Sequence, residues 1–316
     1  MRFFAKSRTL PGWLAVTVDP AGARAVHVKR EPNARPAVEL AAFFPAEPER
    51  EADALQRACK ELHAASYRCT TLLNEGAYQI VSVEAPNVPP DELKVAIRWR
   101  VKDLLDFHID DATIDVLAIP SERNASSRAK SMYVVAARNQ IVQQRQALFE
   151  QARFPLSVID IPELAQRNVA SLAEPEGRGL AMISFAGAAG LLTVSFGGEL
   201  CLSRRIDIGF EQLLHANEQE RNGLLDRITL ELQRSLDHVD RQFHFITLSK
   251  LLIAPLGESD AGLKDYLASN LHLPVEHFAL DSVLNLERVP ELLNPETQRL
   301  FLPAIGAALR HEEAVP

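Results

Sequence analysis

Hydrophobic and polar residues alternate along the first part of the chain. Residues 13–28 read WLAVTV, then the turn residues DPAG, then ARAVHV, which predicts two strands joined by a tight turn. Residues 38–44 add a third strand, and residues 47–65 place apolar side chains on one face of a predicted helix. Short strands are predicted at residues 70–73 and 80–83. The opening of the chain therefore predicts a mixed α/β unit.

A second pattern covers residues 81–155, where a strand, a helix, two strands and a helix predict a compact module. Its first helix starts behind a proline-rich stretch, and its core stripe consists of Leu93, Ile97, Val101, Leu104 and Leu105. At 100° per residue, Trp99 falls on the opposite face, beside Arg98 and Arg100. An aromatic ring and two guanidinium groups facing away from the core are typical of an interface anchor. These three residues are our partner-binding candidates, and packing of Trp99 within the chain is the alternative.

The acidic stretch EPEG at residues 174–177 is the best lobe boundary in the sequence. Before it, residues 158–161 predict a strand and Pro162 opens a helix. After it, the pattern predicts strands at 200–208, 249–254 and 275–279, and helices at 222–245, 262–271 and 303–310. We therefore expect a first lobe of residues 1–80 and 156–176, an inserted module of 81–155 and a second lobe of 177–316.

Residues 179–198 carry no formal charge over a length that suits a membrane-spanning helix. Glycine and hydroxyl residues, however, divide this run into LAMISF and LLTVSF, joined by AGAAG. Two short apolar segments around a small-residue turn favour a buried β-hairpin.

Composition narrows the functional classes. The formal net charge of −8 and the pI of about 5.7 argue against a large basic surface for nucleic acid. Cys59, Cys69 and Cys201 form no C-x-x-C pair, so neither a disulfide framework nor a zinc site is indicated, and a reduced cytoplasm fits. The N-terminal segment lacks the apolar core of a signal peptide, and we expect the protein not to be exported. The sequence also lacks the P-loop, dinucleotide-binding, zinc-protease and nucleophile-elbow motifs.

Four segments carry a resemblance to a known family: YQIVSVEAPNVPPDELKVAIRWRVKDLLDFHIDDATIDVLAIP, YVVAARNQIV, VIDIPELAQRN and GGELCLSRRIDIG. They resemble the MshI proteins of mannose-sensitive haemagglutinin (MSHA) pilus biogenesis. Those proteins are similar to the PilM component of type IV pilus machines and to the cytoplasmic part of type II secretion L proteins. The resemblance covers about residues 11–310. It implies an α/β, actin-like (ribonuclease H-like) fold of two lobes, with a small SHS2-like module inserted in the first.

The resemblance also locates a nucleotide pocket. An actin-like ATPase needs an acidic, glycine-rich hairpin in each lobe, whose amides cradle phosphates while the carboxylate holds hydrated magnesium. The PilM-type Asp-x-Gly motif falls on Thr17 and Asp19, followed by Ala21 and Gly22. The carboxylate is thereby replaced by Thr17, and the hydroxyl residues that follow it in PilM are lost. A shifted register in which Asp19 is the magnesium carboxylate is the alternative, and it would leave the first lobe partly competent.

The other two parts of that pocket are altered as well. In the second lobe the acidic position falls on Ser184, with Ala186 in place of a glycine and Gly187 beside it; the adenosine-side loop keeps Gly257 but contains Pro255. We therefore predict a degenerate pocket, no enzymatic activity and no cofactor, with ATP and magnesium as the alternative. Asp160 could serve as a catalytic carboxylate, although a strand-end residue before a helix is the simpler interpretation.

The resemblance implies a partner: a PilN-like, single-span inner-membrane protein whose short cytoplasmic N-terminal segment binds between the first lobe and the inserted module. Our main prediction is thus a non-catalytic cytoplasmic adaptor, recruited to the inner-membrane face, that also meets other pilus components. An actin-like ATPase that gates pilus or type II secretion assembly is the alternative, and a cytoskeletal filament is a third hypothesis.

Overall fold

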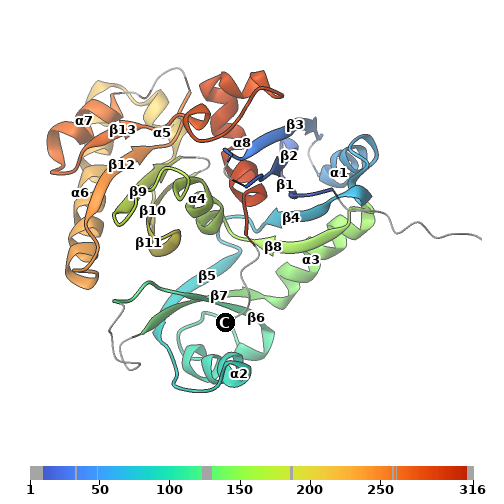
Figure 1. Ribbon diagram of the computed structural model, residues 1–316, viewed down its shortest axis with the longest axis horizontal. Helices are drawn as coiled ribbons and strands as arrows, with labels where there is room; N and C mark the ends of the chain where they lie inside the picture. The colour runs from blue at the N-terminus through green and yellow to red at the C-terminus, as the bar shows by residue number, and fades with distance from the viewer. Residues whose placement is uncertain are drawn as a thin grey trace, which may run out of the picture.

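Two five-stranded sheets and one three-stranded sheet form the framework of the protein (Figure 1). The computed structural model describes residues 10–32, 34–47, 49–122, 130–185, 188–257, 260 and 262–311. Each five-stranded sheet consists of three antiparallel strands followed by two strands parallel to the first. The two sheets therefore have the same topology, which is the arrangement expected for two related lobes.

The first sheet has the order β3-β2-β1-β4-β8. Its strands are β1 (Trp13–Asp19), β2 (Gly22–Lys29), β3 (Ala37–Pro45), β4 (Arg68–Leu72) and β8 (Leu156–Asp160). At the β1–β2 turn, the Asp19 carboxylate accepts hydrogen bonds from the Ala21 and Gly22 amides. Gly22 has φ +144°, and a Cβ there would lie 2.2 Å from the Phe44 carbonyl oxygen. Only glycine allows β3 to approach the turn this closely.

The second sheet has the order β11-β10-β9-β12-β13. Its strands are β9 (Gly179–Ser184), β10 (Gly190–Phe196), β11 (Glu199–Ile206), β12 (Leu248–Ile253) and β13 (Val275–His277). The hairpin expected from the uncharged run is confirmed, because β9 and β10 pair antiparallel with Ser184 opposite Leu191. β9 is buried along its whole length, which explains why its sequence does not alternate.

Helices α4 (Pro162–Ala170) and α8 (Pro295–Ala308) lie between the two five-stranded sheets. Together they form one hydrophobic core with residues of both sheets. The helix predicted to start at residue 303 begins at Pro295 instead, since the Asn294 side chain accepts a hydrogen bond from the Thr297 amide and caps it. Pro303 lies inside the helix.

The outer faces of the two sheets are covered by the remaining helices of the lobes. Helices α1 (Glu51–Glu61) and α3 (Asn139–Gln151) cover the first sheet, and α5 (Phe210–His215), α6 (Glu218–Gln242) and α7 (Leu263–Asn270) cover the second. Helix α6 starts four residues before the predicted 222, because Asn217 and Glu220 form a capping box there. The short helix α5 was not predicted.

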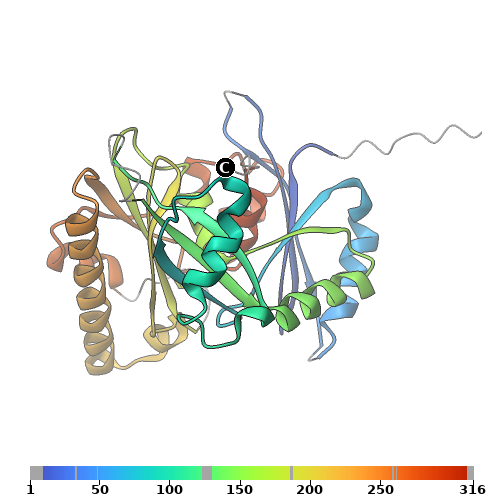
Figure 2. The same cartoon turned by 90° about the horizontal axis from the view of Figure 1, so that it is seen from below.

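The three-stranded sheet has the antiparallel order β5-β7-β6 and packs against α2 (Figure 2). Its elements are β5 (Tyr78–Glu84), β6 (Ala112–Ala118), β7 (Ser131–Arg138) and α2 (Pro90–Val101). Ile97 and Val101 of the predicted stripe are buried, but Leu104 is 54% exposed because the helix ends before it. The predicted lobe boundaries and the SHS2-like character of this unit stay predictions.

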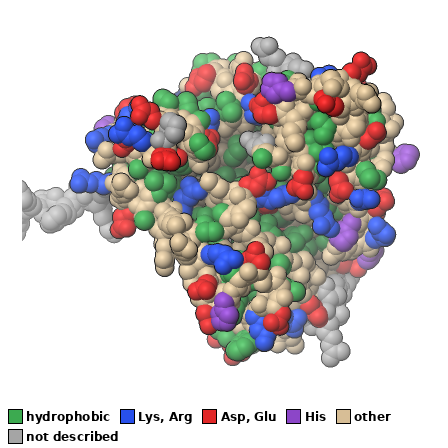
Figure 3. Space-filling view, turned by 180° about the vertical axis from the view of Figure 1, so that it is seen from behind, with side chains coloured by type: hydrophobic (Ala, Val, Ile, Leu, Met, Phe, Trp, Pro, Cys, Tyr) green, Lys and Arg blue, Asp and Glu red, His purple; other side chains and the backbone are tan. Residues whose placement is uncertain are grey.

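Side chains of both charge signs are interspersed over the rear face of the molecule (Figure 3). Within the described ranges, the helices are all too short or too polar to cross a lipid bilayer.

Candidate functional site

A cavity of about 230 Å³ lies between the two lobes. It is lined by Thr17, Val18, Leu72, Leu73, Asn74 and Glu75 of the first lobe, by Pro162 and Gln166 of α4, by Ser184, Ala189, Leu191 and Arg205 of the second lobe, and by Leu302 and Pro303 of α8. Small-molecule pockets usually measure roughly 300–1,000 Å³, so this one is small. The structure thus brings Thr17 and Ser184 to one cavity, whereas Ala186 and Gly187 fall outside the described residues.

Asp19 is held by the β1–β2 turn. Its Oδ1 accepts hydrogen bonds from the Ala21 and Gly22 amides, at 2.8 and 3.2 Å, and its Oδ2 forms an ion pair with Arg24. Asp19 does not line the interlobe cavity but a groove beside the turn. The Asp19 carboxylate is therefore already used to close the hairpin at which the phosphates were expected.

The Ser184 hydroxyl is used in a buried network around Gln166. Ser184 Oγ donates to Gln166 Oε1 at 2.5 Å. The Gln166 amide nitrogen lies 2.9–3.0 Å from three acceptors: the carbonyl oxygens of Met182 and Leu191 and the hydroxyl of Thr193. At the position where the resemblance predicted a magnesium-binding carboxylate, this chain joins α4 to the β9–β10 hairpin with neutral hydrogen bonds.

The predicted adenosine-side loop follows β12. Pro255 is buried, and Gly257 has φ +110° with open space where a Cβ would lie. Neither residue belongs to the described lining of the interlobe cavity. The neighbouring Leu256 packs into the hydrophobic core of the second lobe. Among the described residues of the predicted degenerate pocket, Thr17 and Ser184 line the cavity, whereas Asp19, Ala21, Gly22, Pro255 and Gly257 lie elsewhere.

Asp160 lies at the end of β8 with its side chain buried. Its Oδ1 accepts a hydrogen bond from the Ile161 amide, and its Oδ2 lies 3.7 Å from Nη1 of Arg310. Burial raises the pKa of this carboxyl, which the charge of Arg310 counteracts. Asp160 does not line the cavity, so its geometry fits the strand-end interpretation.

A charged cluster around Arg205, which lines the cavity, was missed by sequence reasoning. Arg205 Nη2 of β11 donates to Tyr78 Oη at 2.7 Å and to Glu163 Oε1 at 2.9 Å, and Tyr78 Oη donates to Glu163 Oε2 at 2.5 Å. Glu75 completes the cluster through an ion pair with Arg205. Burial, followed by the charge of Glu163, raises the pKa of the Tyr78 hydroxyl. No sequence signal links these residues, because they come from separate parts of the chain.

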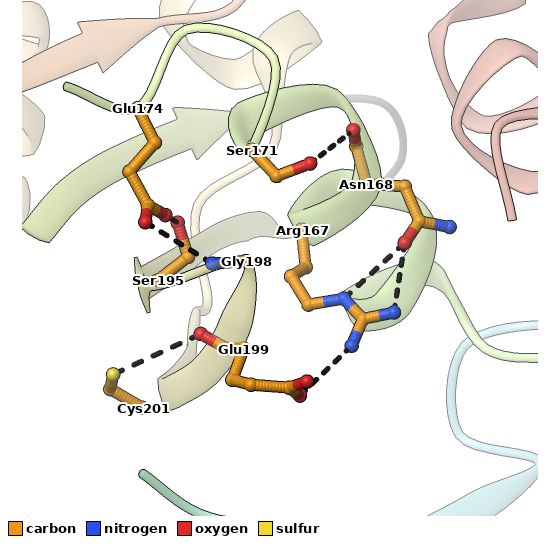
Figure 4. Close-up of polar contacts among 8 residues, drawn as sticks. All are labelled: Arg167, Asn168, Ser171, Glu174, Ser195, Gly198, Glu199 and Cys201. Atoms are coloured by element: carbon orange, nitrogen blue, oxygen red, sulfur yellow. Dashed lines mark hydrogen bonds and ion pairs between the residues drawn. The ribbon is translucent and has the colours of Figure 1, made fainter. Parts of the chain in front are cut away.

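Helix α4 is also fixed to the second lobe by polar contacts near its end (Figure 4). Arg167 contacts the Asn168 side chain and forms an ion pair with Glu199 at 3.3 Å. Glu174 accepts hydrogen bonds from the Ser195 hydroxyl and the Gly198 amide. Helix α4, which follows directly after a first-lobe strand, is therefore anchored on the second sheet.

Two grooves run along α3, where it meets the first lobe. One, of about 410 Å³, lies between α3, the β1–β2 turn and the start of α1, and is lined by Val18, Asp19, Pro20, Glu51, Asn74, Ala77, Ile141, Gln144, Arg145 and Leu148. We call it the turn groove. The other, of about 630 Å³, lies between α3 and the edge strand β8 and includes Phe149, Phe154 and Val158.

The three partner-binding candidates lie on α2. Trp99 is 71% exposed, with Lys102 Nζ 5.6 Å from the centre of its ring. The guanidinium of Arg98 donates to the carbonyls of Ile109 and Ala112, and that of Arg100 donates to the carbonyl of Glu84. Trp99 is therefore free of the core, whereas both arginines are engaged within the three-stranded unit. Trp99 lines neither groove along α3.

These features define the class of protein. Two sheets of equal topology lie around a central cavity, and a small α/β unit is attached to them. This arrangement is an actin-like fold. The model of the family "Type IV pilus assembly protein PilM" matches residues 46–215, more than half of the chain. The chain belongs to the PilM type IV pilus assembly family. No curated protein matches it.

Two solved structures show the same fold. A structure described as the PilM-PilN type IV pilus biogenesis complex is 21% identical, with a TM-score of 0.73 over 94% of this chain and 98% of that one. The cytoplasmic domain of EpsL, an inner-membrane component of the type II secretion system of Vibrio cholerae, is 15% identical, with a TM-score of 0.52 over 96% of this chain and 97% of that one. The fold expected from the sequence is therefore confirmed.

Proposed function

We propose that this chain is a non-catalytic adaptor of type IV pilus assembly, which binds the short cytoplasmic N-terminal segment of a PilN-like inner-membrane protein. Membership of the PilM family and the similarity to a PilM-PilN complex support this role. The resemblance of residues 78–120 to MshI proteins favours an MSHA-type pilus as the system served. Such an adaptor would work in the cytoplasm, at the inner-membrane face.

The turn groove is our proposed site for that segment. Apolar side chains, among them Pro20, Ile141 and Leu148, line much of it. The carboxylates of Asp19 and Glu51 also line it, together with Arg145, whose guanidinium donates to the Asn74 side chain. Cytoplasmic flanks of membrane-spanning segments are enriched in Lys and Arg. A peptide with apolar anchors and a basic residue near the membrane would match these two features of the groove.

The absence of catalysis is part of the same proposal. Thr17 cannot replace a carboxylate that holds hydrated magnesium, and the Ser184 hydroxyl is already bonded to Gln166. The cavity between them is smaller than most small-molecule pockets. The alternative is an actin-like ATP-binding protein, and titration with labelled ATP and magnesium decides between the two. Saturable binding would show that the pocket is still competent.

Peptide binding tests the adaptor role. Fluorescence anisotropy should detect binding of the labelled N-terminal peptide of the single-span pilus protein. Ile141→Arg should lower the affinity for this peptide at least tenfold, because it places a charge in the turn groove. Gln143→Arg is the matched control, since Gln143 is exposed on the same helix and lies outside the described lining of both grooves. A loss on Trp99→Ala but not on Ile141→Arg would move the site to α2 and overturn the groove assignment. No binding by the wild type would overturn the adaptor role itself.

A further inference from the structure

The three-stranded unit belongs to the first lobe by its chain connections. It enters through the link between β4 and β5 and leaves through α3 into β8, and both β4 and β8 are strands of the first sheet. Its packing, however, extends to the second lobe. Figure 1 shows the three-stranded sheet below both five-stranded sheets, with β7 approaching β11.

One contact between this unit and the second lobe involves Tyr133 of β7. Its hydroxyl donates to the Cys201 carbonyl of β11 at 2.8 Å, and burial raises the pKa of this hydroxyl to about 12. The ring of Tyr133 and the side chain of Ile119 pack into the hydrophobic cluster of the second lobe. Since β11 is an edge strand, the three-stranded unit covers part of that edge.

A second contact is the Arg205 cluster. Arg205 of the second lobe binds Tyr78, the first residue of β5, together with Glu163 of α4 and Glu75 of the link into the unit. Glu163 is only 1% exposed. If β11 moved away from the three-stranded unit, Arg205 would lose its contacts with Tyr78 and Glu75, and the cluster around the buried Glu163 carboxylate would keep fewer partners, which is unfavourable. The cluster therefore resists separation of β11 from the three-stranded unit.

From these two contacts we infer that the three-stranded unit is a brace that fixes the angle between the lobes. It is part of one lobe by connectivity and is bonded to the other by Tyr133 and Tyr78. A change of the interlobe angle that parts the unit from β11 must break both contacts together, in addition to disturbing the α4–α8 core that the two lobes share. This inference concerns the fold and is independent of which partner the protein binds.

Hydrogen exchange measured by mass spectrometry tests the brace in the full chain. The double variant Tyr78→Phe/Tyr133→Phe removes only two hydroxyl groups and should raise amide exchange at least tenfold in β7 and in β11. Tyr266→Phe is the control, because Tyr266 donates to Asp226 within the second lobe. It should leave both strands protected.

Two outcomes would overturn the brace. One is unchanged exchange in β11 of the double variant; the other is faster exchange confined to β7, which would mark a purely local role for the two hydroxyl groups. If the double variant unfolds, Tyr133→Phe alone gives the same comparison, since it removes a single hydrogen bond. Protection of α6 reports in each case whether the second lobe itself remains folded.

Discussion

The close contact between helices α4 and α8 gives the sharpest test of the architecture. A Cβ at Gly306 of α8 would lie 2.1 Å from the Ala165 carbonyl oxygen and 3.0 Å from its Cα, whereas ordinary contacts begin at 3.4 Å. Gly306→Ala therefore forces α4 and α8 apart by more than 1 Å. It also strains the hydrogen bond that Asn168 Nδ2 donates to the Gly306 carbonyl at 3.0 Å.

One stabilising and two destabilising effects decide the change in the free energy of unfolding. Alanine is favoured over glycine in a helix interior by about 1 kcal/mol, and overpacking of a core costs about 1–3 kcal/mol. Adding the strained hydrogen bond, at about 1 kcal/mol, we expect Gly306→Ala to lower the free energy of unfolding by about 1–3 kcal/mol. Gly223→Ala serves as the control, because Gly223 is exposed in α6 with nothing within 4 Å of its Cβ position.

The assay is urea denaturation of both variants followed by circular dichroism. Gly223→Ala should raise the midpoint and Gly306→Ala should lower it, so the same chemical change acts in opposite directions. Equal stabilisation by both substitutions would refute the close packing of α4 on α8. It would also remove the basis for a core shared by the two lobes.

Three further predictions concern buried polar groups. Burial raises the pKa of the Asp160 carboxyl, so its ionised form costs stability above the ordinary Asp pKa of about 3.9. The stability of Asp160→Asn relative to wild type should therefore rise as pH increases from about 4, and urea midpoints at several pH values that differ by a constant amount would contradict this. Burial raises the pKa of the Cys69 and Cys201 thiols to about 12, so at pH 8 only roughly one in 10⁴ is ionised, and a disulfide reagent should label Cys59 alone in the folded protein. Gln166→Met should cost about 2–4 kcal/mol in urea unfolding, since it leaves several buried partners unpaired; a loss below about 1 kcal/mol would show that the network contributes little.

Much of the fold could be predicted from the sequence because its signals are local. The alternation before and after the DPAG turn specifies β1 and β2, and the small residues inside residues 179–198 specify a hairpin. Errors arose where two local signals competed. Pro303 is a plausible first residue of a helix, but Pro295 behind the capping Asn294 is the actual one.

The site was less predictable, since its contacts join distant parts of the chain. Thr17 and Ser184 were found through the resemblance, and they do reach one cavity. The Gln166 network and the Arg205 cluster correspond to no recognisable sequence pattern. Each depends on how α4 packs against strands that follow it in the sequence. Helix periodicity placed Trp99 away from the core, yet it could not tell that the adjacent guanidinium groups bond to backbone carbonyls.

Helix α4 joins the two lobes through polar contacts as well as through the shared hydrophobic core. A nucleotide bound between two lobes contacts both and thereby holds them together. Here α4 makes such contacts with the protein's own groups: Gln166 bonds to the β9–β10 hairpin, and Asn168 bonds to α8. The apolar surfaces of α4 and α8 are already buried in a core shared by both sheets. The lobes are thus joined by the protein's own groups, and their packing against α4 and α8 does not require an acidic residue at position 17 or 184.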